Sequence, residues 1–197
     1  MKQREYKDYE AYVQHQKEAR WSGKEEEYFK LHHKKHLIEF RLWFATAVPH
    51  ITFKDSRSIC LGPSFCAEVV ILRELGSNCI GLDLIATPPW SIAGDFHNVP
   101  FGDKEFDFVY SNALDHANDL NKFVSEAKRI VKPDGLIMFH LHLGQGCDRG
   151  YESMSIQIPE DILHRLPEFE VLLNQPIDPY PSGSRNMNWT LLLRKPK

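Results

Sequence analysis

The sequence predicts an α/β protein with a mostly parallel sheet, a C-terminal antiparallel hairpin and an N-terminal helical extension. Short apolar runs alternate with amphipathic helical segments from about residue 56 onward, as expected for parallel strands joined by helices. One run, NCIGLDL, is apolar enough to be buried on both faces of a sheet. The last two runs have no helical segment between them, so we expect them to pair as a hairpin.

The N-terminal residues 1–55 predict two amphipathic helices. Tyr6, Tyr9 and Val13 recur at helical spacing, and a second helical face carries Phe29, His33, Leu37, Phe40 and Phe44. We expect these helices to lie on a larger domain formed by residues 56–197. Exposed aromatic side chains on them also favour a homodimer.

The remaining elements follow in order along the chain. We expect strands at 57–62, 78–84, 106–112, 136–143, 169–177 and 188–195, and helices at 66–75 and 120–131. KPDG closes the second of these helices, and a loop rich in Pro, Gly and Ser joins the last two strands.

Composition narrows the functional classes. The chain has 197 residues, 42% of them hydrophobic and 26% charged, which predicts one medium-sized, soluble globular domain. A net charge of −3 provides no general attraction for nucleic acid. We expect no signal peptide, because the N-terminus is charged where a signal peptide would be apolar. We expect no membrane helix, because no apolar run approaches about 20 residues. Four cysteines without CxxC spacing suit free thiols, so we expect a cytoplasmic protein.

The segment GDFHNVPFGDKEFDFVYSNALDHANDLNKFVSEAKRIVKPDGLIMF carries a longer pattern. Its shared positions are Asp95, Pro100, Phe101, Phe106, Asp107, Val109, Glu126, Arg129, Lys132, Pro133 and Gly135. In this pattern and in its order of elements, the chain from about residue 55 to 197 resembles the class I S-adenosylmethionine-dependent methyltransferases. The resemblance implies a Rossmann-like fold, S-adenosylmethionine as cofactor and methyl transfer as the activity.

The first strand-to-helix turn, CLGPSF, departs from that family pattern. The family keeps an acidic residue and three glycines here, whereas this chain has Cys60 at the acidic position and keeps only Gly62. Ser64 and Cys66 stand at the other two glycine positions, and both are small enough for the turn to survive. Glu68 follows near the start of the helix, either as a ligand of the cofactor or as an acidic residue that the helix dipole stabilises.

Asp83 is the strongest candidate for cofactor binding. It ends a strand 21 residues after the glycine turn, where a carboxylate commonly accepts hydrogen bonds from a ribose; a turn-capping role is the alternative. The resemblance places Leu84 beside it, Asp95 at the adenine amino group and Asn112 at the methionine end. It places Phe96 beside the adenine ring, with simple core packing as the alternative.

The interval between Asp83 and Asp95 is too short for a crossover helix. Pro88 and Pro89 predict an extended loop. We expect Trp90 to cover the exposed sheet rather than the adenine, and the N-terminal helices to fill the gap and to close over the cofactor.

Candidates for acceptor chemistry follow two strands at their carboxyl ends. His116 is the first candidate for a general base, with Asp115 beside it and His142 as a second candidate. His140 and His142 are two residues apart on a strand and are expected to point the same way. Buried or capping roles remain open for each, and we expect no metal site.

The sequence therefore predicts a methyltransferase with a small-molecule acceptor, methylated on oxygen or nitrogen. One alternative is a degenerate, non-catalytic partner subunit with the same fold. Another is an RNA or protein acceptor, which would require a basic surface formed by Lys30, Lys34, Lys35 and Arg41.

Overall fold

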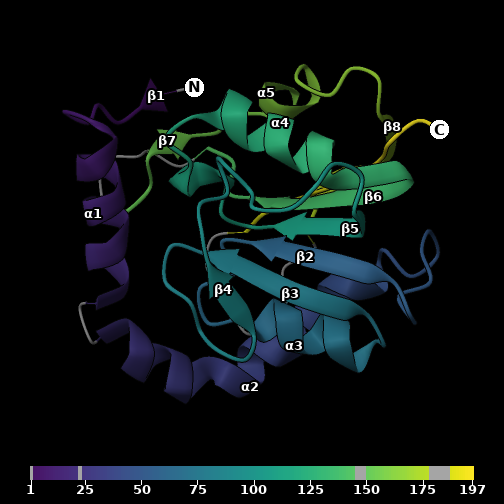
Figure 1. The fold of residues 1–197 in the computed structure, drawn as a ribbon, viewed down its shortest axis with the longest axis horizontal. Coiled ribbons are helices and arrows are strands. Elements are labelled where there is room, and N and C mark those ends of the chain that lie inside the picture. The colour runs from purple at the N-terminus through teal and green to yellow at the C-terminus, as the bar shows by residue number, and fades with distance from the viewer. Residues whose placement is uncertain (1, 22–23, 145–149, 178–186) are drawn as a thin grey trace.

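A computed structural model describes residues 2–21, 24–144, 150–177 and 187–197, leaving aside the side chains of residues 19–33. Within this part of the chain, seven strands form one sheet in the order β4-β3-β2-β5-β6-β9-β8 (Figure 1). Their bounds are Ser91–Ala93 (β4), Asn78–Asp83 (β3), Arg57–Leu61 (β2), Phe106–Ser111 (β5), Val131–Leu141 (β6), Trp189–Arg194 (β9) and Glu170–Pro176 (β8).

The sheet is parallel from β4 to β6 and antiparallel at its other edge. β2 pairs in parallel with β3 and β5, and β4 and β6 extend the parallel part on either side. β9 then lies antiparallel between β6 and β8. The predicted mostly parallel sheet with a C-terminal hairpin is confirmed. The strand order reverses between β2 and β5, and in such folds ligands bind at the carboxyl ends of the strands next to this reversal.

Helices cover both faces of the sheet (Figure 1). One face carries α3, Ala67–Glu74, together with α2, Lys24–Ala45, and the other carries α4, Leu120–Ile130. α4 begins where the Asp119 carboxylate accepts the backbone N–H of Lys122, an N-cap that satisfies one free donor of the first turn. Its buried side chains recur at helical spacing and face the sheet: Leu120, Phe123, Val124, Ala127 and Ile130.

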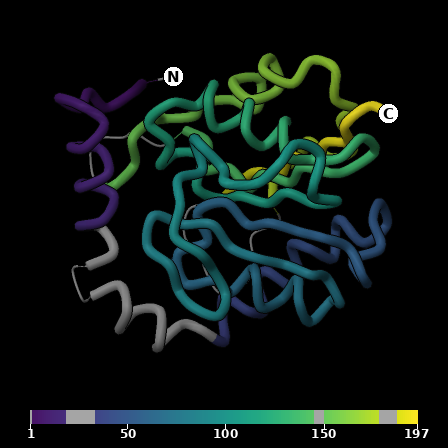
Figure 2. Tube along the Cα trace, in the orientation of Figure 1, coloured from purple at the N-terminus to yellow at the C-terminus, as the bar shows by residue number. Residues whose placement is uncertain are grey.

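The two N-terminal helices are confirmed, but they occupy different places. α2 does not replace the missing crossover helix: its Phe44 packs edge-on against Phe108 and Tyr110 of β5. α1, Tyr9–Trp21, lies at the carboxyl ends of the parallel strands. Figure 2 shows the chain start, β1 (Lys2–Gln3), beside β7 (Met154–Ser155), with which it pairs antiparallel. This pairing attaches the first described residues to the segment that precedes α5.

The segment between β3 and β4 contains no helix, as predicted. Trp90 packs against the core on the α3 face, and the Arg73 guanidinium lies 4.9 Å from the centre of its ring. It therefore covers the sheet where a crossover helix would lie, which confirms the expected covering role.

The sequence pattern missed several short elements. These are η1 (Leu114–His116), α5 (Glu160–Leu163) and the β1–β7 pair, each too short to show a hydrophobic period. Cys60, Cys66 and Cys79 are buried, and no disulfide joins them in the part of the chain that the structure describes. In the described part of the chain, every helix is too short or too polar to span a membrane. Cys147, the side chains of Phe29 and His33, and the loop between β8 and β9 lie outside the described residues.

Candidate functional site

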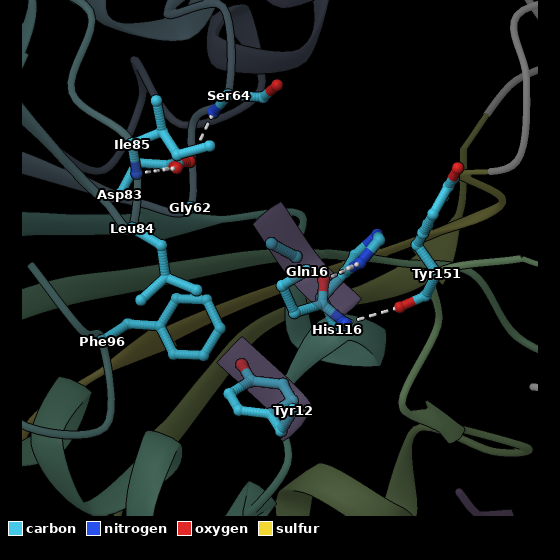
Figure 3. A pocket seen from close by; sticks show the side chains of 11 residues that line it. Tyr12, Gln16, Gly62, Ser64, Asp83, Leu84, Ile85, Phe96, His116 and Tyr151 are labelled. Carbon is cyan, nitrogen blue, oxygen red and sulfur yellow. Dashed lines mark hydrogen bonds between the residues drawn. The ribbon is translucent and has the colours of Figure 1, made fainter. Parts of the chain in front are cut away.

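A cavity opens at the carboxyl ends of β2, β3 and β5, beneath α1. Its walls come from the turn after β2, the end of β3, the loop after β4, the turn after β5, and α1 (Figure 3). The lining residues are Tyr12, Gln16, Gly62, Ser64, Asp83, Leu84, Ile85, Phe96, Ala113, His116 and Tyr151. The strand ends thus bring together six of the ten residues predicted for the site: Gly62, Ser64, Asp83, Leu84, Phe96 and His116.

The turn after β2 retains the geometry of a glycine-rich turn despite its lost glycines. Gly62 has φ +72°, and a Cβ added there would lie 2.7 Å from the Cβ of Ala113, so only glycine fits. Ser64 and Cys66 also adopt the left-handed region, with φ of 45° and 63°. The two non-glycine residues hold the conformation that glycine favours, at a cost in backbone strain.

Asp83 ends β3 with its carboxylate at the cavity. One oxygen accepts the backbone N–H of Ser64 at 3.0 Å, and the other accepts that of Ile85 at 3.0 Å (Figure 3). The turn-capping role considered for this residue is therefore present. A carboxylate oxygen can accept more than one hydrogen bond, so the turn-capping role is compatible with the predicted hydrogen bonds to a ribose.

Phe96 lines the cavity, whereas Asp95 is not one of the lining residues. One Asp95 oxygen accepts the backbone N–H of His97 and its Nδ1–H, both at 2.8 Å, and the other accepts the hydroxyl of Tyr9 on α1. Burial opposes ionisation of Asp95, but these hydrogen bonds outweigh it and lower its pKa. The carboxylate predicted to contact adenine is thus held by α1 and by its own turn.

Asn112 lies on the other side of the glycine turn. With Gly62 and Ser64 it lines a neighbouring hollow, which also contains Glu68. Glu68 is 3% exposed, and burial raises its pKa to about 8 with an added contribution from Asp83, while its own backbone N–H opposes the rise. In the described part of the chain, no cationic side chain forms an ion pair with Glu68, so a buried, uncompensated carboxyl faces this hollow.

His116, from η1, brings an imidazole into the cavity. Its side chain is 37% exposed and its Nδ1 lies 3.0 Å from the Gln16 Oε1. Asp115 is buried behind it, with 3.9 Å between its Oδ1 and the His116 Nε2, too long for a hydrogen bond. Burial raises the pKa of Asp115, although the neighbouring histidines oppose the rise. Asp115 does not line the cavity.

The expectation that His140 and His142 point the same way is wrong. β6 ends at Leu141, so His142 lies beyond the alternation of the strand. His140 lies under α2, where its Nδ1 is 2.9 Å from the Tyr110 hydroxyl and burial lowers its pKa to about 3. His142 lies on the Asp115 side, where burial lowers its pKa, and it is set back from the cavity.

Sequence reasoning missed the contributions of Tyr12 and Gln16 from α1. Tyr151, from the segment before β7, also lines the cavity. A period of apolar residues identifies α1 as a helix, but says nothing about which strand ends it covers. Among the described residues, no group of three or more His, Cys, Asp or Glu side chains is arranged to hold a metal ion.

Comparison with known proteins agrees with this architecture. Residues 59–139 match the family model of a methyltransferase domain. A curated relative, a malonyl-[acyl-carrier protein] O-methyltransferase of Halorhodospira halophila, is 38% identical over 52 residues, which are 26% of this chain and 18% of that protein. The chain thus matches less than a quarter of the length of its first curated relatives.

Solved structures resemble most of the chain at low sequence identity. One comes from a Haloferax volcanii complex of the Trm112 methyltransferase activator with a methyltransferase. Its TM-score is 0.67 at 16% identity, and the match covers 93% of this chain and 98% of the matched chain. Another is the Burkholderia thailandensis 1,6-didemethyltoxoflavin-N1-methyltransferase with bound S-adenosylhomocysteine. Its TM-score is 0.63 at 15% identity, with 82% and 79% of the two chains covered.

The chain has the fold of these solved methyltransferases, and its residues 59–139 are similar to a methyltransferase domain. The cofactor that this resemblance implies is S-adenosylmethionine.

The donor set at the cavity suits this cofactor. The turn at Gly62 leaves room that a Cβ would fill, Asp83 offers carboxylate oxygens for a diol, and Phe96 offers an apolar ring face. Glu68 offers a buried carboxyl that a cationic ligand would cause to ionise.

Proposed function

We propose that this chain transfers a methyl group from S-adenosylmethionine to a small-molecule acceptor, on oxygen or nitrogen. The observation that carries the proposal is the single cavity in which Gly62, Asp83 and Phe96 lie together with His116. Groups suited to a nucleoside and a group suited to proton transfer thus face one enclosed space.

The residues of the chain have separate roles in this proposal. Gly62, Ser64, Asp83, Leu84 and Phe96 hold the nucleoside part, while Asn112 and Glu68 face the methionine part. Bound S-adenosylmethionine supplies an electrophilic methyl group on a positively charged sulfur. His116 accepts the proton that an acceptor hydroxyl or amine releases, and passes it to water.

α1 supports this role by covering the cavity. Tyr12 is 1% exposed and lines the cavity together with Gln16. A covered site excludes bulk water and strengthens the electrostatic interactions inside it. Asp115 and His142 lie behind His116, so we assign them to tuning its surroundings rather than to contact with the acceptor.

The comparisons support the acceptor class only in outline. The name of the Halorhodospira relative specifies an O-methyltransferase, and that of the Burkholderia neighbour specifies an N1-methyltransferase. Oxygen and nitrogen are the two acceptor atoms that the proposal includes. The basic surface that an RNA or protein acceptor would require is partly neutralised: the Lys35 Nζ lies 3.8 Å from the Glu39 Oε1, and the Arg41 Nη2 lies 2.5 Å from the Glu74 Oε2. The side chain of Lys30 lies outside the described residues.

A partner-dependent methyltransferase is the second candidate. It is favoured by the left-handed Ser64 and Cys66 in the cofactor turn and by a structural neighbour taken from a complex with an activator protein. In this case the purified chain folds but binds the cofactor weakly until a partner stabilises the turn. A homodimer is a further proposal, supported by the exposed Ile38, Leu42 and Val48.

The test is a turnover assay with methyl-labelled S-adenosylmethionine. The purified chain is incubated with panels of hydroxyl, carboxyl and amine compounds, with RNA, and with protein, and S-adenosylhomocysteine is quantified. Formation of the product only with small molecules supports the proposal. Transfer only to RNA or protein contradicts the acceptor class, and the absence of both binding and transfer by the folded chain favours the partner-dependent candidate.

A further inference from the structure

The side chain of Gln16 makes a set of contacts that links α1 to the imidazole of the site. Its Nε2 lies 2.7 Å from the backbone carbonyl oxygen of Tyr151 and 3.1 Å from the Ser153 Oγ. Its Oε1 lies 3.0 Å from the His116 Nδ1. Figure 3 shows Gln16 between His116 and Tyr151.

These contacts determine which end of the amide faces His116. A backbone carbonyl oxygen only accepts hydrogen bonds, so the group of Gln16 that meets Tyr151 must be the NH₂. The amide oxygen therefore faces the imidazole. An amide oxygen only accepts, so the His116 Nδ1 must carry the proton of this hydrogen bond.

The position of this proton decides what His116 can do. A neutral imidazole carries one proton, so a proton on Nδ1 leaves Nε2 with a free lone pair. No described side chain donates a hydrogen bond to Nε2, and the nearest carboxylate oxygen, from Asp115, is 3.9 Å away. The ring that lines the cavity thus presents an unprotonated nitrogen.

We propose that Gln16 is a positioning residue that holds His116 in the Nδ1–H tautomer, with Nε2 available as the proton acceptor of the site. The proposal rests on the function proposed above only for the use of that nitrogen. The tautomer itself is a property of the free chain.

Other groups near His116 also influence which of its ring nitrogens carries the proton. His15, from α1, and Asp115, from the same turn, interact with it electrostatically. The Asp115 carboxyl would favour a proton on the facing Nε2, whereas Gln16 favours a proton on Nδ1. Gln16 makes the direct hydrogen bond, so its preference prevails.

The test is nuclear magnetic resonance of the full chain with ¹⁵N-labelled histidine rings, at about pH 8.5, where an ordinary imidazole is neutral. A His116→Asn variant assigns the resonances. We expect the wild-type His116 Nε2 to show the chemical shift of an unprotonated ring nitrogen. A protonated Nε2 in the wild type overturns the proposal, and this measurement requires no change at Gln16.

Two variants on the same helix separate positioning from packing. Gln16→Met keeps the length of the side chain and removes both ends of its hydrogen bonding. Gln14→Met is the matched control, because Gln14 is exposed and bonds only to Glu18 on its own helix. We expect the population with an unprotonated Nε2 to fall at least about twofold in Gln16→Met and to stay unchanged in Gln14→Met.

Circular dichroism and a thermal melt establish that each variant is folded. An unchanged tautomer in folded Gln16→Met overturns the proposal. Binding of S-adenosylmethionine is measured in parallel by calorimetry, so a failure of the proposed function shows as lost binding and a failure of this inference shows as an unaltered ring.

Discussion

The Asp83 carboxylate accepts the backbone N–H of Ser64 at 3.0 Å and thereby joins the end of β3 to the turn after β2. Ser64 stands where related turns carry a glycine, and it adopts a φ of 45°. The hydrogen bond holds a residue in a region that its side chain disfavours. A turn with a single glycine therefore keeps its shape because a neighbouring strand end supports it.

Replacing Ser64 by glycine is expected to stabilise the fold. Glycine adopts the left-handed region freely, which removes roughly 1 kcal/mol of strain, while the backbone N–H that bonds to Asp83 remains. Chemical denaturation measures the change. Ser125→Gly is the control, because Ser125 is exposed within α4 and glycine there lowers helix stability. Equal destabilisation by both changes would refute strain at Ser64.

Gly62→Ala is expected to destabilise the chain by about 2 to 5 kcal/mol. The new Cβ would meet the Cβ of Ala113 at 2.7 Å, in addition to the cost of a positive φ. Gly144→Ala measures the cost of the positive φ alone, because Gly144 has φ +82° and no heavy atom lies close to an added Cβ. We expect a smaller loss at Gly144 in the same denaturation experiment. Similar losses at both positions would show that close approach to Ala113 does not matter.

Glu68 makes stability depend on pH in a defined direction. Burial raises its pKa in the folded chain to about 8, from an ordinary value of 4.5. The folded state therefore holds more protons than the unfolded state between these values, and stability decreases as pH rises through this window. In the wild type, the free energy of unfolding should fall by on the order of 3 to 6 kcal/mol between pH 4.5 and pH 8. We expect this decrease to be absent in Glu68→Gln.

Denaturation at several pH values measures this slope. Glu160→Gln, at an exposed position in α5, is the control and should retain the wild-type pH dependence. If Glu68→Gln also retains it, the carboxyl is not the buried, protonated group described above.

Binding of a cation next to Glu68 should release a proton below pH 8. A nearby positive charge favours the ionised carboxyl, so the affinity for S-adenosylmethionine should rise as pH increases towards 8 and then level off. Calorimetry in buffers of different ionisation enthalpy measures the proton release. A wild-type release that persists undiminished in Glu68→Gln would assign it to another group.

The sequence was sufficient for the sheet because its strands and helices have clear apolar periods. It also placed Gly62 and Asp83 at the carboxyl ends of the strands, because Gly62 follows one strand and Asp83 ends another. It did not predict that Asp95 is held by Tyr9 of α1, since that contact joins residues far apart in the chain. Nor did it separate His140 from His142, because the strand ends one residue before the second histidine. The position of Gln16 depends on how α1 lies over the sheet, which no local pattern encodes.

The most direct test of the account is calorimetric binding of S-adenosylmethionine and S-adenosylhomocysteine to the wild-type chain and to Asp83→Asn. Loss of a charge-assisted hydrogen bond weakens binding by about 1.5 to 3 kcal/mol, or roughly 10- to 100-fold. We predict micromolar binding by the wild type and a loss of this size in the folded variant. Absence of binding to the folded wild-type chain, or equal binding by both proteins, would contradict the assignment of this cavity as the cofactor site.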